Sequence, residues 1–206
     1  MAPEFTAFPK IARLRREVVV TEKLDGTNSC IYVPEDPSEP LVAGKRTSWI
    51  APGPSDNFWF AAWVAEHSLE LRHGLTPGIH FGEWWGERIN RRYPIVAGRK
   101  FSLFNTERWR PKIARPPELY GPKAVPCPDC CDVVPVLARV GRIYDVALEN
   151  ILDGLRKNGS VAAPGCKAEG IVVFHTASKS AFKVTCEKDD EWKGTSAPGD
   201  GAAGEG

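Results

Sequence analysis

The feature that most constrains the fold is a pair of short extended runs separated by a tight turn near the N-terminus. Residues Glu17–Lys23 (EVVVTEK) favour a strand because β-branched side chains pack well on a pleated surface. Asp25-Gly26 is a turn signal, and Asn28–Val33 (NSCIYV) resumes the extended pattern before a proline-flanked loop. The sequence therefore predicts short strands joined by turns, with a lysine at the end of the first strand.

Further extended runs outnumber the helical ones. The other predicted strands are Leu41–Arg46, Ile79–Trp85, Arg99–Phe104, Gly170–His175 and Ala181–Cys186. Because they are joined by loops rather than by regular helical crossovers, we expect an α+β fold, with mainly antiparallel sheets and a few flanking helices.

Two segments have helical spacing. Ser55-Asp56 can cap a helix that runs to about Leu71, whose predicted apolar face is Phe58, Ala62, Ala65 and Leu69. A second helix is expected from about Arg142 to Lys157, with Gly159 just past its end. Its predicted face is Tyr144, Ala147, Leu148, Ile151 and Leu155.

Composition points to one folded domain. The chain has 206 residues, of which 42% are hydrophobic, enough to bury a core. Its longest apolar run is the eight residues Phe58–Ala65, and the N-terminus lacks the pattern of a secretion signal, so we expect a cytoplasmic monomer with no membrane partner. Residues 1–194 are expected to form the domain, and the acidic, Gly/Ala-rich residues 195–206 a disordered tail.

Positive charge is concentrated in one segment. Between Arg88 and Arg115 there are nine Lys or Arg residues and one acid, interleaved with the rings of Tyr93, Phe101, Phe104 and Trp109. Cations mixed with flat rings are typical of surfaces that hold phosphates and bases, which predicts a polynucleotide partner; a solvated face is the alternative.

Three of the six cysteines are clustered at Cys127, Cys130 and Cys131. They could form half of a zinc site, but the chain has no second Cys-x-x-Cys, and its one His pair at zinc-ligand spacing, His67-x5-His73, lies more than fifty residues before the cysteines. A proline-held loop in a reduced protein is the preferred interpretation.

Common phosphate-binding signatures are not present in a usable setting: there is no Gly-x4-Gly-Lys-Ser/Thr loop, and the Gly-x-Gly-x-x-Gly pattern of residues 199–204 falls in the predicted tail, not between a strand and a helix. A series of short motifs takes their place, in the order Lys23-x-Asp25-Gly26, Gly44-Lys45-Arg46, Phe81-Gly82-Glu83, Phe101-Ser-Leu-Phe104, Glu169-Gly170-Ile171-Val172 and Phe182-Lys183-Val184.

This order resembles the successive motifs of the covalent nucleotidyltransferase superfamily, over about Val18 to Val184. The combination of Glu22-Lys23 with Gly26-Thr27-Asn28 is most similar to RNA ligases of the phage nick-sealing type. The resemblance implies a nucleotidyltransferase (ATP-grasp-like ligase) core, and an ATP-dependent ligase that joins 5′-phosphate and 3′-hydroxyl ends. It also implies ATP and Mg²⁺ (or Mn²⁺) as cofactors and RNA as the partner, with DNA or hybrid nicks as further substrates.

The resemblance also implies a role for each matching residue. Lys23 would be the nucleophile that forms the lysyl-adenylate, and Lys183 would neutralise the α-phosphate. Glu169 would bind the divalent metal. The nucleotide would be held by Glu22 beside the adenine edge, by Arg46 at ribose and phosphate, by Glu83 at the ribose hydroxyls, and by Phe104 stacked on the base. For Asn28 and Asp25 two roles stay open, contact with the substrate or stabilisation of the turn alone, because both residue types bond their own backbone in turns.

Two positions depart from the family pattern. Asn105 stands where many relatives have Asp, and Thr185 stands where relatives often have a second lysine. Three alternatives therefore stay open: a minimal DNA ligase, a guanylyl- or adenylyltransferase of the same superfamily, and a non-catalytic RNA-binding module with this fold. The short stretch beyond Val184 disfavours capping enzymes and most DNA ligases, which carry an additional C-terminal domain.

Overall fold

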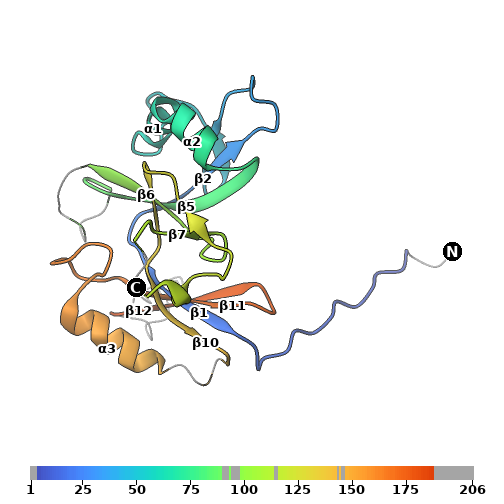
Figure 1. Ribbon diagram of the computed structural model, residues 1–206, viewed down its shortest axis with the longest axis vertical. Helices are drawn as coiled ribbons and strands as arrows, with labels where there is room; N and C mark the ends of the chain where they lie inside the picture. The colour runs from blue at the N-terminus through green and yellow to red at the C-terminus, as the bar shows by residue number, and fades with distance from the viewer. Residues whose placement is uncertain are drawn as a thin grey trace, which may run out of the picture.

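The computed structural model describes residues 4–89, 93, 98–113, 116–142, 144 and 147–187. Part of the basic segment and all of the tail 195–206 lie outside these residues. Figure 1 shows two main sheets, with short helices at one end of the molecule and a longer helix at the other. No helix in the described part of the chain combines the length and apolar character needed to cross a bilayer.

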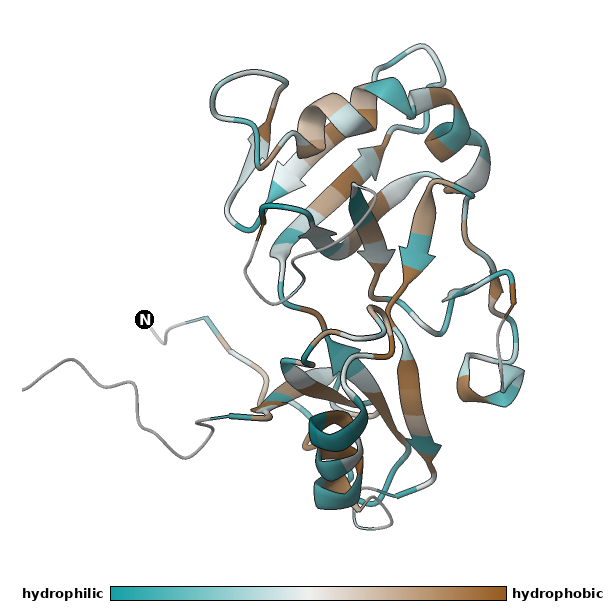
Figure 2. Ribbon diagram, turned by 90° about the vertical axis from the view of Figure 1, so that its left-hand side faces the viewer, coloured by the Kyte–Doolittle hydropathy of each residue, from teal (hydrophilic) through white to brown (hydrophobic). Residues whose placement is uncertain are grey.

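The first sheet, called sheet A, is built around the N-terminal strand. Its order is β10-β1-β11-β12, all antiparallel, with bounds Val136–Val140, Val18–Lys23, Gly170–His175 and Ser180–Thr185. Helix α3 (Leu148–Asn158) covers one face, and its Leu152 and Leu155 pack with Val18, Val20 and Ile171. Figure 2 shows this helix against the apolar strands.

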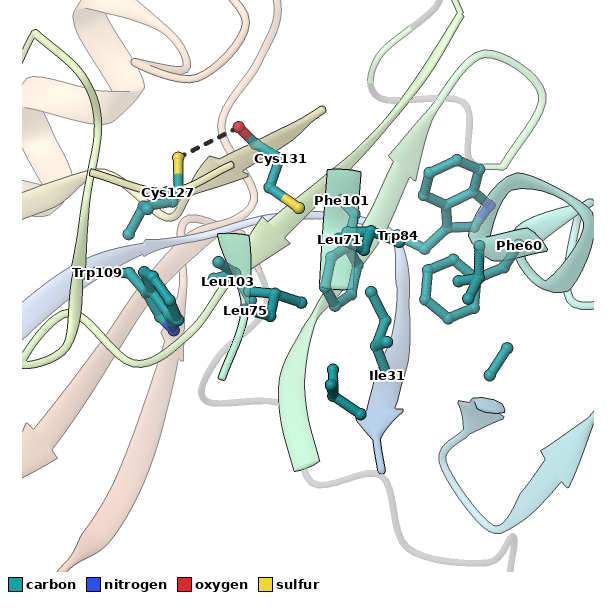
Figure 3. Close-up of a cluster of buried hydrophobic side chains, with 14 of the residues drawn as sticks. Ile31, Phe60, Leu71, Leu75, Trp84, Phe101, Leu103, Trp109, Cys127 and Cys131 are labelled. Atoms are coloured by element: carbon teal, nitrogen blue, oxygen red, sulfur yellow. Dashed lines mark hydrogen bonds between the residues drawn. The ribbon is translucent and has the colours of Figure 1, made fainter. Parts of the chain in front are cut away.

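The second sheet, called sheet B, carries most of the aromatic core. Its order is β4-β3-β2-β5-β6-β9, with bounds Ser48–Ile50, Val42–Lys45, Thr27–Val33, Gly78–Gly86, Arg99–Leu103 and Cys131–Val133. Only β6 and β9 pair in parallel among these strands. Helices α1 (Phe60–Glu66) and α2 (Ser68–Gly74) cover one face, and Figure 3 shows Phe60 and Leu71 against Ile31, Trp84 and Phe101.

The turn at Leu24–Gly26 passes the chain from sheet A to sheet B. Strand β1 belongs to one sheet and β2, which begins at Thr27, to the other. The lysine at the end of β1 therefore lies where the two sheets meet. This is the position from which a side chain can act on a molecule held by both sheets.

The predicted α+β class with mainly antiparallel sheets is confirmed, and the predicted strands are present within a few residues. The sequence did not predict strands β4, β9 and β10. It also did not predict the small parallel pair of β7 (Trp109–Arg110) and β8 (Val125–Pro126) or the 3-10 turn η1 (Pro117–Leu119). Strand β10 was missed because Pro135 and Arg139 interrupt its apolar pattern. In the fold, Arg139 is tied to Glu17 by an ion pair of 2.8 Å.

The helix predicted from Ser55-Asp56 to Leu71 is wrong in register and extent. Two helices meet at His67, and Phe60, Ala61, Val64 and Leu71 are the buried residues, whereas Leu69 is 75% exposed. Asp56 does cap the first helix, since its carboxylate accepts the N–H groups of Ala61 (2.7 Å) and Ala62 (3.0 Å). The helix nevertheless begins only at Phe60, which turns a different face to the core.

The second predicted helix begins later than expected, at Leu148. Tyr144 and Ala147 are therefore exposed residues ahead of the helix rather than members of its apolar face. Leu148, Ile151 and Leu155 do pack toward sheet A, together with Leu152. Gly159 ends the helix at a φ of 82°, as its position in the sequence predicts.

The cysteine cluster fills part of the sheet B core. Cys127 and Cys131 are buried, and the Cys127 thiol donates to the Cys131 carbonyl at 3.2 Å (Figure 3). Burial raises the pKa of Cys127 to about 11. The Cys131 N–H donates to Pro128 O, so the segment is a proline-held turn up to Cys130, after which β9 begins. Among the described residues, no group of three or more His, Cys, Asp or Glu is placed to hold a metal ion.

Candidate active site

An ion pair between Lys23 and Glu169 lies at the centre of the candidate site. The Lys23 Nζ is 2.6 Å from Glu169 Oε2, and the two side chains are 23% and 17% exposed. Lys23 ends β1, and Glu169 directly precedes β11, where Gly170 is the strand partner of Lys23. The amine is thus half-buried, held in one place, and still accessible to a small molecule.

Strand alternation decides which other side chains share this face of sheet A. Thr21, Val172 and Lys183 form one row across three strands, and Lys23, Gly170 and Thr185 form the next. Paired residues point to the same side of a sheet, so Lys183 lies on the Lys23 face, opposite α3. Lys183 is exposed on that face.

The turn after Lys23 is fixed by a carboxylate from sheet B. The Gly26 N–H donates to Glu83 Oε1 at 3.1 Å. A Cβ at Gly26 would lie 2.5 Å from the Trp84 carbonyl oxygen, so this close approach requires glycine. Burial raises the pKa of Glu83 from 4.5 to about 7, and the positive charge of Lys23 opposes that rise. Lys23, Glu169 and Glu83 therefore form one electrostatic cluster at the junction of the sheets.

The remaining predicted nucleotide contacts are placed by sheet B. Asn28 pairs with Glu83, so both face the same side, and Asn28 is exposed. Phe104 follows β6, is 37% exposed, and donates its N–H to the Phe81 carbonyl at 3.0 Å. Arg46 is exposed in the β3–β4 turn, one residue beyond the pair of Lys45 with Ser29. Strand pairing puts Asn28 beside Glu83 of the cluster. No hydrogen bond or ion pair of Asn28, Arg46 or Phe104 with Lys23 is found among the described residues.

Glu22 is the predicted site residue whose side chain points away. Neighbouring strand residues alternate, and the Glu22 carboxylate is only 1% exposed on the α3 side of sheet A. One of its oxygens accepts the N–H groups of Val161 (2.9 Å) and Ala162 (3.0 Å), and burial raises the pKa of the carboxyl. Its carboxylate therefore holds a loop in place, and a contact with adenine stays a prediction for its backbone alone.

Sequence reasoning missed Asn57, which fixes the strand that follows the turn. Asn57 accepts a hydrogen bond from Thr27 Oγ1 at 3.2 Å and donates one to Ser29 Oγ at 3.0 Å. The three residues belong to segments about thirty positions apart, and no local pattern indicates their contact. The bridge holds the start of β2 in place directly beside Gly26.

The carboxylates of the cluster suit a hard divalent cation. Glu169 and Glu83 interact electrostatically, and both lie near the amine that would attack a phosphate. Magnesium is commonly held by one or two carboxylates together with substrate phosphates and water. Glu169 fits that mode as one carboxylate ligand, with Glu83 adding negative charge nearby.

Comparison with models of protein families shows which family the chain belongs to. A model of the RNA ligase family matches residues 16–185, so the chain belongs to the RNA ligase family. The matched range includes both sheets and every predicted site residue. No curated protein matches the chain significantly.

Solved structures of an RNA ligase from Naegleria gruberi share the fold. A mutant with ATP and Mn gives a TM-score of 0.55 at 20% identity, covering 92% of this chain and 60% of that one. The ligase with PPi and another mutant with AMP and Mn each give 0.54 at 20% identity, covering 89% of this chain and 57% of theirs. The chain thus spans no more than three fifths of these relatives.

Proposed function

We propose that this chain is an adenylyltransferase domain of an ATP-dependent RNA ligase, which joins 5′-phosphate and 3′-hydroxyl ends through a lysyl-adenylate. The observation that carries the proposal is the 2.6 Å pair of Lys23 and Glu169 at the junction of the sheets, beside Glu83. Membership of the RNA ligase family supports it. The related Naegleria structures that contain ATP, AMP and PPi are consistent with the same three-step chemistry.

In the first step the Lys23 Nζ attacks the α-phosphorus of ATP. A P–N bond forms, the bond from the α-phosphorus to the bridging oxygen breaks, and pyrophosphate leaves. The ammonium must first lose a proton, and Glu169 Oε2, at 2.6 Å, is within reach of it. Lys183, on the same face, would offset charge that develops on the α-phosphate oxygens.

Two further transfers complete the reaction. The 5′-phosphate of the RNA attacks the adenylate and frees the lysine, which yields an adenylated 5′ end. The 3′-hydroxyl then attacks the 5′-phosphorus, and AMP leaves as the phosphodiester forms. Lys23 is covalently needed only in the first two steps. Glu169 and Lys183 remain beside the reacting phosphate throughout.

Recognition of the nucleotide would come from sheet B. The Phe104 ring would stack on the base, Glu83 would contact the ribose hydroxyls, and Arg46 would contact ribose and phosphate. Asn28, on the same face as Glu83, is a further candidate substrate contact. Glu169 would hold a divalent metal, which would neutralise phosphate oxygens when it is bound. Restriction to RNA, the phage nick-sealing type, a monomeric state and a cytoplasmic location stay predictions within this proposal.

Covalent labelling tests the first step directly. Incubation with α-labelled ATP and Mg²⁺, followed by denaturation, should leave one label per chain on the wild type and none on Lys23→Ala. Lys112→Ala is the matched control, because Lys112 also pairs with a carboxylate, that of Asp129, but lies outside the candidate site. A Lys23→Ala protein that retains full labelling would overturn the assignment.

A pre-adenylated RNA nick separates ligation from self-adenylation alone. Lys23→Ala should seal this substrate but fail with ATP and an unmodified nick, whereas Glu169→Ala should lose both activities. Matched RNA, DNA and hybrid nicks distinguish an RNA ligase from a minimal DNA ligase. If the wild type labels itself with ATP but seals none of these nicks, the chain is an adenylyltransferase of another kind. If it binds RNA without forming the covalent label, it is the non-catalytic RNA-binding module.

A further inference from the structure

Two consecutive aromatic residues have an unusual backbone conformation in the loop before α1. Phe58 has a φ of 50° and Trp59 a φ of 62°, the left-handed region that bulky residues rarely adopt. Their side chains are 41% and 62% exposed. Strain of this kind persists only where surrounding contacts impose it, and it is found preferentially at functional sites.

Three contacts hold this loop from different sides. The Trp84 indole N–H donates to the Phe58 carbonyl at 3.0 Å, and Asn57 bridges Thr27 and Ser29. On the helix side, the Asp56 carboxylate accepts the first free N–H groups of α1. The rings of Phe58 and Trp59 are therefore displayed to solvent on a fixed backbone.

The surroundings of Trp59 are positively charged. The Arg99 guanidinium carbon lies 4.8 Å from the centre of a Trp59 ring. Lys45 and loop residues 53–59 line a hollow of about 580 Å³. The one carboxylate in this lining, Asp56, is engaged with helix N–H groups. A ring beside two cations and an open hollow has the chemistry of a site for an unpaired base and its phosphate.

This surface lies on the α1 side of sheet B, opposite the face of Glu83. Lys45 pairs with Ser29, and Arg99 with Gly86, whereas Asn28 and Glu83 form the alternate row. The Asn57 bridge nevertheless connects the loop to Thr27, the residue that directly follows Gly26. The surface is thus separate from the candidate nucleotide site but adjoins the catalytic turn.

We propose that Phe58, Trp59, Lys45 and Arg99 form a second contact for RNA, in which an unpaired base stacks on Trp59 and its phosphate is held by the two cations. The proposal rests on the proposed function, because it assigns the path of the RNA strand beyond the reacting ends. Unpaired RNA fits better than duplex, because a stacked indole needs an exposed base face.

The test measures affinity for a fluorescently labelled single-stranded RNA by anisotropy, without ATP. Trp59→Ala should weaken binding at least about fivefold, and Trp59→Phe should retain most of it. Lys45→Ala and Arg99→Ala should each weaken binding and flatten its salt dependence, because fewer counterions are released. A thermal melt of each variant checks that the fold is kept.

Tyr144→Ala is the matched control. Tyr144 is 53% exposed and also has an arginine nearby, with Arg142 at 6.0 Å from its ring centre, but it lies beyond sheet A, at the end of β10. Its removal should leave RNA affinity unchanged. Equal losses in Trp59→Ala and Tyr144→Ala, or no loss in either, would overturn the proposal.

Two other outcomes are informative. If Trp59→Ala changes the oligomeric state and leaves RNA affinity intact, the surface contacts protein and the inference is wrong. Self-adenylation of the wild type is measured separately. Its failure would count against the proposed function alone, whereas unaltered RNA binding by all the loop variants would count against this surface alone.

Discussion

Sheet A and sheet B differ in how far they bury the residues of the candidate site. In sheet A the proposed nucleophile, Lys23, ends a central strand that is paired on both sides and buried from Val18 to Val20. In sheet B the residues assigned to recognition lie on an open face, where the rings of Trp49, Phe81 and Phe104 are 53%, 54% and 37% exposed. The proposed nucleophile thus lies on a strand held from both sides, whereas the proposed recognition residues lie on an exposed face of sheet B.

Two glutamates, Glu22 in sheet A and Glu83 in sheet B, also differ in what their carboxylates contact. Burial raises the pKa of both Glu22 and Glu83. Glu22 accepts the N–H groups of a loop behind sheet A, whereas Glu83 accepts that of Gly26 in front of the lysine. A buried carboxylate beside the catalytic motif is therefore a structural support in one sheet and a candidate ligand group in the other.

The largest effect is expected where the two sheets are joined. Gly26→Ala would place a methyl group 2.5 Å from Trp84 O and 2.9 Å from Glu83 Cγ. Displacement of this packed backbone should lower the free energy of unfolding by about 1–3 kcal/mol and reduce self-adenylation at least about a hundredfold. Thermal melts and covalent labelling measure the two effects.

Gly141→Ala serves as its control, because a Cβ there meets nothing within 4 Å. It should change neither quantity appreciably. If Gly26→Ala and Gly141→Ala have the same stability and the same self-adenylation, the backbone at the junction of the sheets can shift to accommodate a methyl group.

A smaller loss is expected on the open face of sheet B. Phe104→Ala removes the stacking ring and should weaken ATP binding by about 1–3 kcal/mol, seen as a raised KM for ATP in self-adenylation. Phe104→Leu should lie between alanine and wild type. Phe182→Ala is the control, because this exposed ring lies on the α3 face of sheet A. An unchanged KM for ATP in the Phe104 variants would show that the ring only packs against its neighbours and does not contact the base.

The sequence predicted what depends on local pattern. Short strands of β-branched residues, the Asp25-Gly26 turn and the Gly159 helix end all follow from nearest neighbours, and each is present. The motif order also identified Lys23, Glu83 and Glu169, which the fold brings into one cluster.

What could not be predicted depends on contacts between distant segments. Helix α1 begins at Phe60 because Asn57 and Phe58 are engaged with β2 and Trp84, which removes them from the helix. The direction of the Glu22 carboxylate depends on which face of β1 meets α3. Apolar spacing between Phe58 and Leu71 permits more than one register, and only the tertiary partners select one.

The third prediction concerns pH and Glu83. Its pKa is about 7 in the folded protein and near 4.5 in an unfolded chain, so folding favours the protonated carboxyl. The stability that this group contributes is present below about pH 4.5 and is lost as the pH rises through about 7. Glu83→Gln should remove that decline and be more stable than wild type above pH 7, by about 1–2 kcal/mol after solvent screening.

Denaturant unfolding between pH 4 and 8.5 measures this difference. Glu87→Gln, an exposed carboxylate just beyond the same strand, is the control and should follow the wild type. A Glu83→Gln curve parallel to that of the wild type would contradict the assigned burial. Adenylation should fall in the same variant, because the amide cannot replace the carboxylate as an acceptor for the ribose hydroxyls.

The smallest effect is expected at the departure from the family pattern in sheet A. Thr185 shares a row with Lys23, and only Gly170, which has no side chain, stands between them. A lysine at this position would add a positive charge on the Lys23 face in place of the Thr185 Oγ1 hydrogen bond to the Glu187 carbonyl (2.8 Å). Thr185→Lys should therefore raise the rate of self-adenylation at low ATP by a few-fold. Ala181→Lys places the same charge on the same strand and face, but two rows farther from Lys23. If both variants gain equally, the added charge acts only by attracting ATP over a distance, and the row that joins Thr185 to Lys23 has no special role. A gain confined to Thr185→Lys would instead show that a charge acts on the phosphate only from the same row of sheet A as Lys23.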